Sequence, residues 1–259
     1  MRIATYNVNS ITARLPRLLA WLESSGTDVL CIQETKCTAE QFPAEALREA
    51  GYESAVNATG RWNGVALLSR VGLTDVVTGL PGGPEYEGVQ EPRAISATCG
   101  PLRLWSVYVP NGREVEHDHY AYKLAWLEAL RKAVAADAVG ALPFAVLGDF
   151  NVAPTDEDVW DPELFVGATH VTPAERAALA ALEGEGLGEV LPRPLKYDRA
   201  YTFWDYRELR FPKNKGMRID LTFGNPAFTA VVKDSYVDRE ERKGKGASDH
   251  APVVVDLDL

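Results

Sequence analysis

Apolar runs of strand length recur along the whole chain, and each is predicted to form a β-strand. The runs cover residues 3–8, 29–33, 65–68, 102–109, 144–147, 219–223 and 253–257. Between some of them, apolar residues recur at helical spacing. The first such face consists of Leu15, Leu18, Leu19 and Leu22. A longer face consists of Tyr122, Leu124, Leu127, Leu130 and Val134. Strands are expected to outnumber helices.

Local signals mark two helix boundaries. The first helix is expected to end near Gly26, since glycine favours the helix terminus. A third helix is predicted to begin at Thr172, because Thr172-Pro173-Ala174-Glu175 is a capping box with proline in the first turn. No low-complexity linker divides the chain, and the loops at 80–92 and 184–194 are interpreted as insertions. We therefore predict one α/β domain spanning residues 1–259.

Composition excludes several classes of protein. Hydrophobic residues make up 46% and charged residues 25% of the chain, as in folded globular proteins rather than disordered ones. No apolar run approaches the roughly 20 residues that span a bilayer, so we expect a cytoplasmic protein without a membrane partner. Cys31, Cys37 and Cys99 form neither a disulfide framework nor a Cys-x-x-Cys pair, which argues against structural zinc.

The net charge of −10 argues against a protein that holds nucleic acid by bulk electrostatic attraction. A local basic groove is still compatible with this charge. Acidic residues gathered around a divalent cation would also contribute to the excess.

Polar residues stand at the ends of several predicted strands. They are Asn7, Glu34, Tyr108, Asp149 and Asp220. In layered α/β architectures strand ends from distant parts of the chain converge where sites are assembled. We therefore expect the acidic residues to meet. For Asn7 and Glu34 taken singly the alternative is a solvated strand end, and for Tyr108 it is an ordinary aromatic strand residue.

Two short motifs carry the strongest chemical signals. In Gly148-Asp149-Phe150-Asn151 an extended chain would place the Asp149 carboxylate beside the Asn151 amide donor, although a simple β-turn is the alternative. In Ser248-Asp249-His250 the side chains of Asp249 and His250 point oppositely. A distant carboxylate, best supplied by Asp220, is needed to orient the imidazole and raise its basicity, unless His250 is an ordinary core or surface residue. Asn7, Glu34, Asp149 and Asp249 form an all-oxygen set suited to Mg²⁺ or Mn²⁺.

The joint pattern resembles the exonuclease III/abasic-site (AP) endonuclease family of the endonuclease/exonuclease/phosphatase superfamily. The motifs, in the family's order, are Asn7, Gln33-Glu34-Thr35, Tyr108-Val109-Pro110-Asn111-Gly112, Gly148-Asp149-Phe150-Asn151, Arg218-Ile219-Asp220 and Ser248-Asp249-His250. Residues 9–15 and 119–126 resemble the bacterial exonuclease III branch. The resemblance implies a four-layer α/β sandwich in which two facing mixed or antiparallel β-sheets are flanked by helices.

The resemblance also implies a reaction, which is Mg²⁺- or Mn²⁺-dependent hydrolysis of a DNA phosphodiester by a DNA repair nuclease. Expected activities are cleavage 5′ to abasic sites, 3′–5′ exonuclease and 3′-phosphatase or phosphodiesterase. The expected partner is double-stranded DNA, abasic or 3′-blocked, and the expected state is a monomer. The alternatives are a superfamily phosphoesterase acting on nonspecific DNA, inositol phosphates or sphingomyelin, and a DNA-binding module without catalysis.

Residue roles follow from the same resemblance. Asp149, helped by Asn151, would activate the attacking water; Tyr108 would stabilise the transition state or assist the leaving group. His250, oriented by Asp220, would contact the phosphate or act as base. The implied metal site draws on Asn7, Glu34, Asp149, Asn151, Asp249 and His250.

Substrate contacts are implied at two further places. Relatives line an apolar pocket for a flipped-out baseless sugar with a segment resembling Phe203, Trp204, Met217 and Ile219, although Trp204 could instead be core. Lys215 and Arg218 flank the proposed site, and as part of a basic patch they could contact DNA phosphates; the alternative is that such surface residues only interact with solvent. Further basic candidates for this patch are Lys213, Lys243, Lys245, Arg61 and Arg70.

Overall fold

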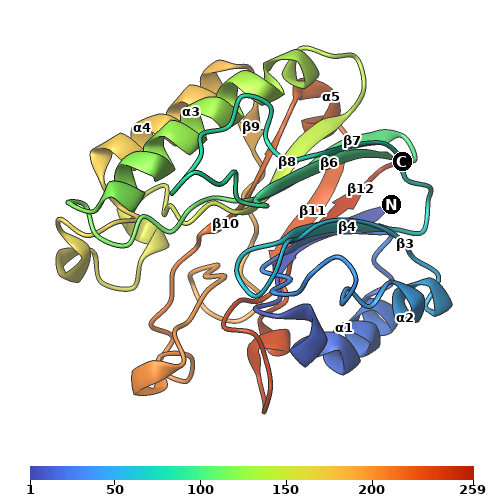
Figure 1. Cartoon of the computed structure of the whole chain (residues 1–259). Coiled ribbons are helices and arrows are strands. Elements are labelled where there is room, and N and C mark those ends of the chain that lie inside the picture. The colour runs from blue at the N-terminus through green and yellow to red at the C-terminus, as the bar shows by residue number, and fades with distance from the viewer.

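The computed structural model describes residues 1–259 and has four layers, with two six-stranded sheets facing each other between two layers of helices (Figure 1). The first sheet has the order β11-β12-β1-β2-β4-β3. Its strands are β1 (Arg2–Asn7), β2 (Val29–Gln33), β3 (Glu53–Asn57), β4 (Val65–Ser69), β11 (Val232–Val237) and β12 (Val253–Leu257). The second sheet has the order β5-β6-β7-β8-β10-β9. Its strands are β5 (Thr74–Thr78), β6 (Ala94–Cys99), β7 (Leu102–Tyr108), β8 (Phe144–Asp149), β9 (Gly188–Glu189) and β10 (Asp220–Gly224).

Each sheet is mixed, which is one of the two arrangements that the resemblance left open. β1 pairs parallel with β2, and β7 pairs parallel with β8, whereas the remaining neighbours are antiparallel. The expected sandwich of two facing sheets flanked by helices is therefore confirmed.

The strands are apolar on both faces because each sheet is covered on both sides. In β2, Val29 and Cys31 belong to the core between the sheets, whereas Leu30 and Ile32 belong to the core beneath the helices. In β8, Ala145 and Leu147 face the other sheet, and the alternate residues pack under the helices of the second layer. A strand buried on both faces reads as a continuous apolar run.

Two pairs of helices form the outer layers. α1 (Ile11–Ser25) and the short α2 (Ala44–Glu49) cover the first sheet, and α3 (Asp118–Ala138) and α4 (Pro173–Gly184) cover the second (Figure 1). α1 ends at Gly26, which has φ 64° as a left-handed cap. The capping box between Thr172 and Glu175 is present at the start of α4. α5 (Pro226–Thr229) is a single turn.

The apolar pattern missed five strands, β3, β5, β6, β9 and β11. β5 is exposed at all five positions, and β11 carries polar residues along a sheet edge, so neither has an apolar run. β6 is buried but composed largely of small residues. Of the two loops taken as insertions, 184–194 contains β9, which pairs with β10. No helix is both long and apolar enough to cross a membrane.

Strand register places the candidate residues at one end of the sandwich. Asn7 is opposite Gln33 in the parallel pair of the first sheet. Asp149 is opposite Tyr108 on one side and Asp220 on the other in the second sheet. Because the carboxyl ends of parallel strands meet at one edge, residues far apart in sequence are brought together.

Candidate active site

The centre of the site is a cluster of Glu34, Asp149 and His250. One ligand atom from each lies within 4.8 Å of the other two. Glu34 follows β2 of the first sheet, Asp149 ends β8 of the second, and His250 precedes β12. The backbone of Glu34 has φ 55°, a left-handed conformation that is uncommon outside glycine and recurs at functional sites. The two sheets thus contribute different members of one cluster.

Asn7 bridges the two carboxylates. Its Nδ2 donates to Glu34 Oε1 at 2.8 Å and to Asp149 Oδ2 at 2.9 Å. Its Oδ1 accepts from the backbone N–H of Asn9 at 3.0 Å. The amide nitrogen of Asn7 thus faces both acids, and Asn7 is a hydrogen-bond partner of the two candidate metal ligands.

The relation between Asp149 and Asn151 differs from the extended arrangement expected from the sequence. Asn151 has φ 50°, and its backbone N–H, not its side chain, donates to Asp149 Oδ1 at 2.9 Å. The side-chain Nδ2 donates to Val109 O at 3.0 Å, and Oδ1 accepts from Asn111 Nδ2 at 3.3 Å. Both polar atoms of the side chain therefore contact the neighbouring loop, which corrects the expectation of an Asn151 amide beside the carboxylate. The assignment of Asn151 to the metal site stays a prediction.

Gly148 permits the close strand approach expected of it. A Cβ at this position would lie 1.9 Å from the carbonyl oxygen of Val107 on the neighbouring strand β7. Any side chain would therefore push β7 and β8 apart and displace Asp149.

His250 contacts Asp220, as predicted, across 2.8 Å between Nδ1 and Oδ2. Its Nε2 faces Asp149 Oδ2 at 3.7 Å. Burial alone lowers the pKa of His250, but the Asp220 and Asp149 carboxylates outweigh it and raise the pKa to about 10. With Nδ1 donating to Asp220, the imidazolium presents Nε2–H as a hydrogen-bond donor, which fits a phosphate contact better than metal ligation.

The electrostatics of the acids fit a bound cation. Burial, with further contributions from Asp220 and Glu34, raises the pKa of Asp149 to about 7. Burial also raises the pKa of Glu34, but Lys36, with Nζ 2.6 Å from Oε2, lowers it below its usual value. Crowded negative charge of this kind is relieved by a divalent ion, and carboxylate oxygens are the ligands that hard cations prefer. The cluster could therefore bind a metal.

Asp249 is not a member of the cluster of Glu34, Asp149 and His250, and its place in the metal site stays a prediction. Its Oδ1 accepts from Asn9 Nδ2 at 3.0 Å, and Ser248 Oγ lies 3.4 Å away. The carboxylate is thus held by Asn9, just before α1, and by the adjacent Ser248, whereas the hydrogen-bond partner of His250 Nδ1 is Asp220.

Tyr108 lies at the end of β7, with the Arg93 guanidinium 4.7 Å from its ring centroid. Burial and the neighbouring Glu34 raise the pKa of the phenol well above its ordinary value. The hydroxyl is therefore a neutral hydrogen-bond donor at all relevant pH values.

The four residues expected to line a sugar pocket lie in different surroundings in the structure. Phe203 lies 4.9 Å from His250 between ring centroids and is half-buried. Trp204 is 1% exposed and packs in a core with Ala251 and Val253, so its assignment to the pocket is wrong. Met217 and Ile219 are buried in a small cluster against which Phe203 packs. Phe203 is the member of the set that contacts His250, whereas Trp204, the next residue along the chain, turns into a different core.

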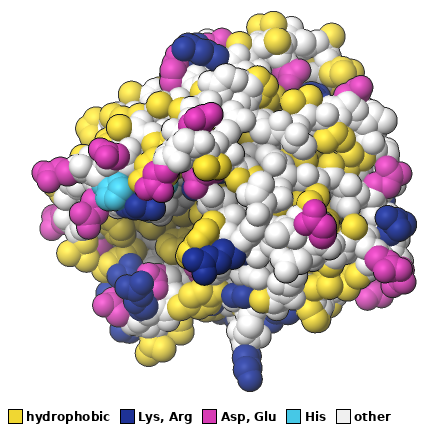
Figure 2. All heavy atoms as spheres, in the orientation of Figure 1, with side chains coloured by type: hydrophobic (Ala, Val, Ile, Leu, Met, Phe, Trp, Pro, Cys, Tyr) yellow, Lys and Arg dark blue, Asp and Glu magenta, His cyan; other side chains and the backbone are white.

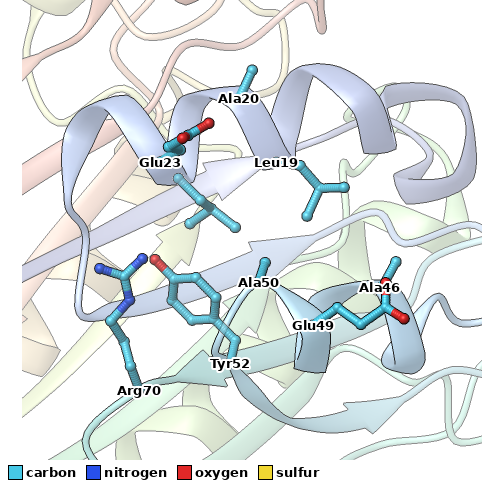
Figure 3. A pocket seen from close by; sticks show the side chains of 9 residues that line it. Leu19, Ala20, Glu23, Ala46, Glu49, Ala50, Tyr52 and Arg70 are labelled. Atoms are coloured by element: carbon cyan, nitrogen blue, oxygen red, sulfur yellow. The ribbon is translucent and has the colours of Figure 1, made fainter.

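The basic patch expected from the sequence also needs correction. Arg218 is 5% exposed and forms a bidentate ion pair with Asp158, so it is not available to DNA. Arg70 adjoins Ser69, which pairs with Val29 at the far end of β2 from Glu34. It stacks on Tyr52 beside a cavity between α1 and α2 (Figure 3). Lys215 lies near the site segment, with Nζ 4.1 Å from the Trp160 ring centroid.

A groove next to the site was missed by the sequence analysis, apart from Arg61. It has a volume of about 600 Å³ and is lined in part by Arg61, Trp62, Asn111 and Arg113. Trp62 is 65% exposed, and the Arg61 guanidinium lies 5.0 Å from its ring centroid. Asn111, which contacts Asn151, connects the groove to the cluster. The sequence signal that could have indicated this groove is the adjacent pair Arg61-Trp62 in a polar loop.

Lysine and arginine side chains on the face shown in Figure 2 lie in small groups among acidic ones and form no continuous basic area. This distribution agrees with the net charge of −10. All three cysteines are free and buried.

A family model described as the endonuclease/exonuclease/phosphatase family matches residues 4–250. The chain belongs to this family. Family members with curated names include exodeoxyribonuclease III of Haemophilus influenzae, which is 27% identical over 98% of this chain and 98% of its own length. Recombination repair protein 1 of Drosophila melanogaster is 30% identical over 96% of this chain, which spans only 37% of that longer protein.

Solved structures of family members superpose closely. The 3′–5′ exonuclease NExo of Neisseria meningitidis has a TM-score of 0.93 and 36% identity, with complete coverage of both chains. A variant of NExo from Neisseria, described as a 3′ phosphatase bound to a product DNA hairpin, has a TM-score of 0.94. An AP endonuclease of Archaeoglobus fulgidus has a TM-score of 0.92 and 32% identity, again with complete coverage of both chains.

Proposed function

We propose that the protein is a Mg²⁺- or Mn²⁺-dependent DNA repair nuclease. It hydrolyses the phosphodiester 5′ to abasic sites and removes nucleotides or blocking groups from 3′ ends of duplex DNA. The observation that carries this proposal is the convergence of Glu34, Asp149 and His250 from both sheets, with Asp220 bound to the imidazole.

The family members support DNA as the substrate. The Haemophilus relative is an exodeoxyribonuclease III, and the Neisseria and Archaeoglobus structures are described as a 3′–5′ exonuclease and an AP endonuclease. The Neisseria 3′ phosphatase was solved with a product DNA hairpin. We propose that this protein acts on abasic, 3′-phosphate and 3′-terminal DNA substrates, and that it does so as a monomer. The cytoplasmic location stays a prediction.

The chemistry follows from the polar groups of the site. A phosphodiester is anionic and repels a nucleophile, so its charge must be offset before in-line attack. A divalent cation held by Glu34 and Asp149 would offset charge on the phosphate and on the leaving 3′ oxygen. Asp149, with a pKa of about 7, is suited to orient the attacking water and accept its proton.

Two fixed donors complete the arrangement. His250 presents Nε2–H toward the Asp149 side of the site and would donate to a phosphate oxygen. Tyr108 keeps its proton and would donate where negative charge develops. Asn7 donates from one amide nitrogen to both Glu34 and Asp149 and would thereby fix the two carboxylates relative to each other.

A side-by-side digestion tests the proposal. Abasic, blunt, 3′-phosphorylated and RNA–DNA hybrid duplexes are incubated with Mg²⁺ and the wild-type protein, and products are resolved on a denaturing gel. Asp149→Asn is the matched inactive control. The proposal fails if no duplex is cut, or if cutting continues at full rate in excess chelator. Phosphate release from inositol polyphosphates without DNA cleavage would favour the alternative phosphoesterase.

A further inference from the structure

Lys123 of α3 is a fully buried lysine that the proposed chemistry leaves unused. Its side chain has 0% exposure, as does that of its partner Glu175 on α4. α3 and α4 lie together over the second sheet (Figure 1). Removing an ammonium from water is costly unless it is paired and hydrogen-bonded, and an apolar residue of the same size would usually serve stability as well. Its presence here therefore calls for a role other than packing.

The ammonium joins two loops that follow the parallel strands β7 and β8. Lys123 Nζ donates to the backbone carbonyl oxygen of Asn151 at 2.7 Å and lies 3.2 Å from that of Asn111. Thr169 Oγ1 lies 3.3 Å away, and Glu175 completes the shell. Four acceptors thus surround the three N–H donors of the lysine, and two of them are backbone carbonyl oxygens of the loops beyond Tyr108 and Asp149.

Glu175 anchors a third segment, the turn before α4. It accepts hydrogen bonds from Thr169 Oγ1 at 2.7 Å and from the backbone N–H of His170 at 2.9 Å. Burial alone would raise the pKa of Glu175, but Lys123 lowers it below its ordinary value, so the carboxylate stays ionised. The pair therefore ties the turn before α4 to both active-site loops.

The turn that carries Asn111 is packed tightly against this network. A Cβ on Gly112 would lie 2.6 Å from Thr169 Oγ1 and 3.1 Å from Lys123 Cδ, and the residue has φ 93°. Only glycine combines this backbone conformation with so close an approach. Asn111 is thereby held where its amide donates to Asn151 Oδ1.

The connection to the reacting groups runs through Asn151. With φ 50°, Asn151 directs its carbonyl toward Lys123 and its N–H toward Asp149 Oδ1, 2.9 Å away. The other oxygen of Asp149 faces Asn7 and His250. A rotation of the Asn151 backbone would release Oδ1 and let the carboxylate turn away from the cluster.

We propose that Lys123 is a positioning residue, whose buried ammonium holds the carbonyl groups of Asn111 and Asn151 and thereby fixes the peptide N–H that orients the Asp149 carboxylate. The inference rests on the proposed function, because it assigns Asp149 to the reaction. A displacement of a reacting group by about 1 Å typically reduces turnover on the order of 100-fold.

The test compares Lys123→Met with the double variant Lys123→Met/Glu175→Gln. The single variant leaves a buried carboxylate without its cation, so its Tm should fall by roughly 10 °C. The double variant removes both charges and keeps a glutamine that suits the capping box, so its Tm should return to within about 4 °C of wild type. In both variants kcat on abasic or 3′-phosphorylated duplex should fall on the order of 100-fold. KM should stay within about twofold, because the groups that bind substrate are unchanged.

A second measurement is independent of catalysis. Hydrogen exchange of the Asn151 amide should be faster in the double variant than in wild type, because the bond to Asp149 is no longer held. Lys132→Met, at a lysine 67% exposed on the same helix, is the matched control and should change neither kcat nor exchange.

Recovery of both Tm and kcat in the double variant would overturn the proposal, since the pair would then serve stability alone. Full activity of Lys123→Met, or failure of both variants to fold, would also overturn it. If the wild-type protein cleaves no DNA, the proposed function fails, whereas the exchange of the Asn151 amide still decides whether Lys123 holds the loop.

Discussion

Replacing Asp220 by Asn should lower the pKa of His250 while leaving the fold in place. Asp220 and His250 are both buried, and Oδ2 lies 2.8 Å from Nδ1. The rise of the His250 pKa from 6.5 to about 10 is a net effect, because burial lowers the pKa and the neighbouring carboxylates raise it by more. Asp220 is the largest of the causes that raise it, so losing its charge should lower the pKa by roughly two units. The backbone N–H of Asp220 is bound independently to Thr202 Oγ1, and an asparagine oxygen can still accept from Nδ1.

The sign of the pH effect follows from the raised pKa. A histidine whose pKa is raised on folding contributes stability that is fully present below its ordinary pKa and is lost as pH rises through the folded-state value. The Tm of metal-free wild type should therefore decline between about pH 6.5 and pH 10. In Asp220→Asn the decline should be smaller and should end at a lower pH.

NMR titration of the imidazole signals in the metal-free protein measures the shift directly, since the chain has only four histidines. The pH profile of kcat is measured alongside. In the variant, the decline of kcat with rising pH should begin at a lower pH than in wild type. Asp249→Asn is the comparison variant. The Asp249 carboxylate accepts from Asn9 rather than from the imidazole and raises the pKa of His250 less than Asp220 does, so its loss should lower that pKa less than Asp220→Asn does. An unchanged His250 titration and unchanged kinetics across pH in Asp220→Asn would refute the reasoning.

Three further predictions concern the loop, the charges and the metal. Asn151→Ala should lower kcat on the order of 100-fold, because alanine disfavours φ near 50° and its substitution would release Asp149. Asn151→Gly should lose less activity, and equal losses of kcat in a steady-state assay would contradict this. Arg218→Met should destabilise the fold by roughly 3–5 kcal/mol, seen in denaturant unfolding, without changing the salt dependence of DNA binding. Arg61→Ala should instead leave the free energy of unfolding unchanged and reduce the slope of log K for DNA binding against log salt concentration by about 0.9. A reduced slope in Arg218→Met and an unchanged slope in Arg61→Ala would restore Arg218 to the DNA patch. Mg²⁺ at about 100 times its Kd should stabilise wild type by about 2.7 kcal/mol, measured by thermal melts. Glu34→Gln should abolish most of this stabilisation by Mg²⁺. Equal stabilisation of the variant and wild type would remove Glu34 from the metal site.

Much of the sandwich was predictable because its central strands are buried on both faces. β2 and β12 were predicted with their observed bounds, since a strand covered by a sheet on one side and helices on the other is apolar over most of its length, and Gln33 and Asp256 are their only polar residues. Edge strands such as β5 carry no such requirement, so their pattern is indistinguishable from a loop. The capping box before α4 was readable because it is a local interaction within four residues.

The side-chain contacts were less predictable where they depend on which way a residue turns. Trp204 and Arg218 stand in segments beside the site, yet one packs into a core and the other pairs with Asp158. The left-handed backbone at Asn151 likewise reversed the expected geometry, so that the N–H and not the amide side chain meets Asp149. Such choices are made by neighbours distant in sequence.

The sequence by itself determined the apolar strands, the helix caps and the chemical types that can meet at the strand ends, because these follow from periodicity and from interactions within a few residues. Only the tertiary structure decided that Glu34, Asp149 and His250 share one cluster, that Asp249 is not a member of it, and that Lys123 is buried behind the loops. Orientation and burial depend on the packing of whole layers, and no short stretch of chain contains that information.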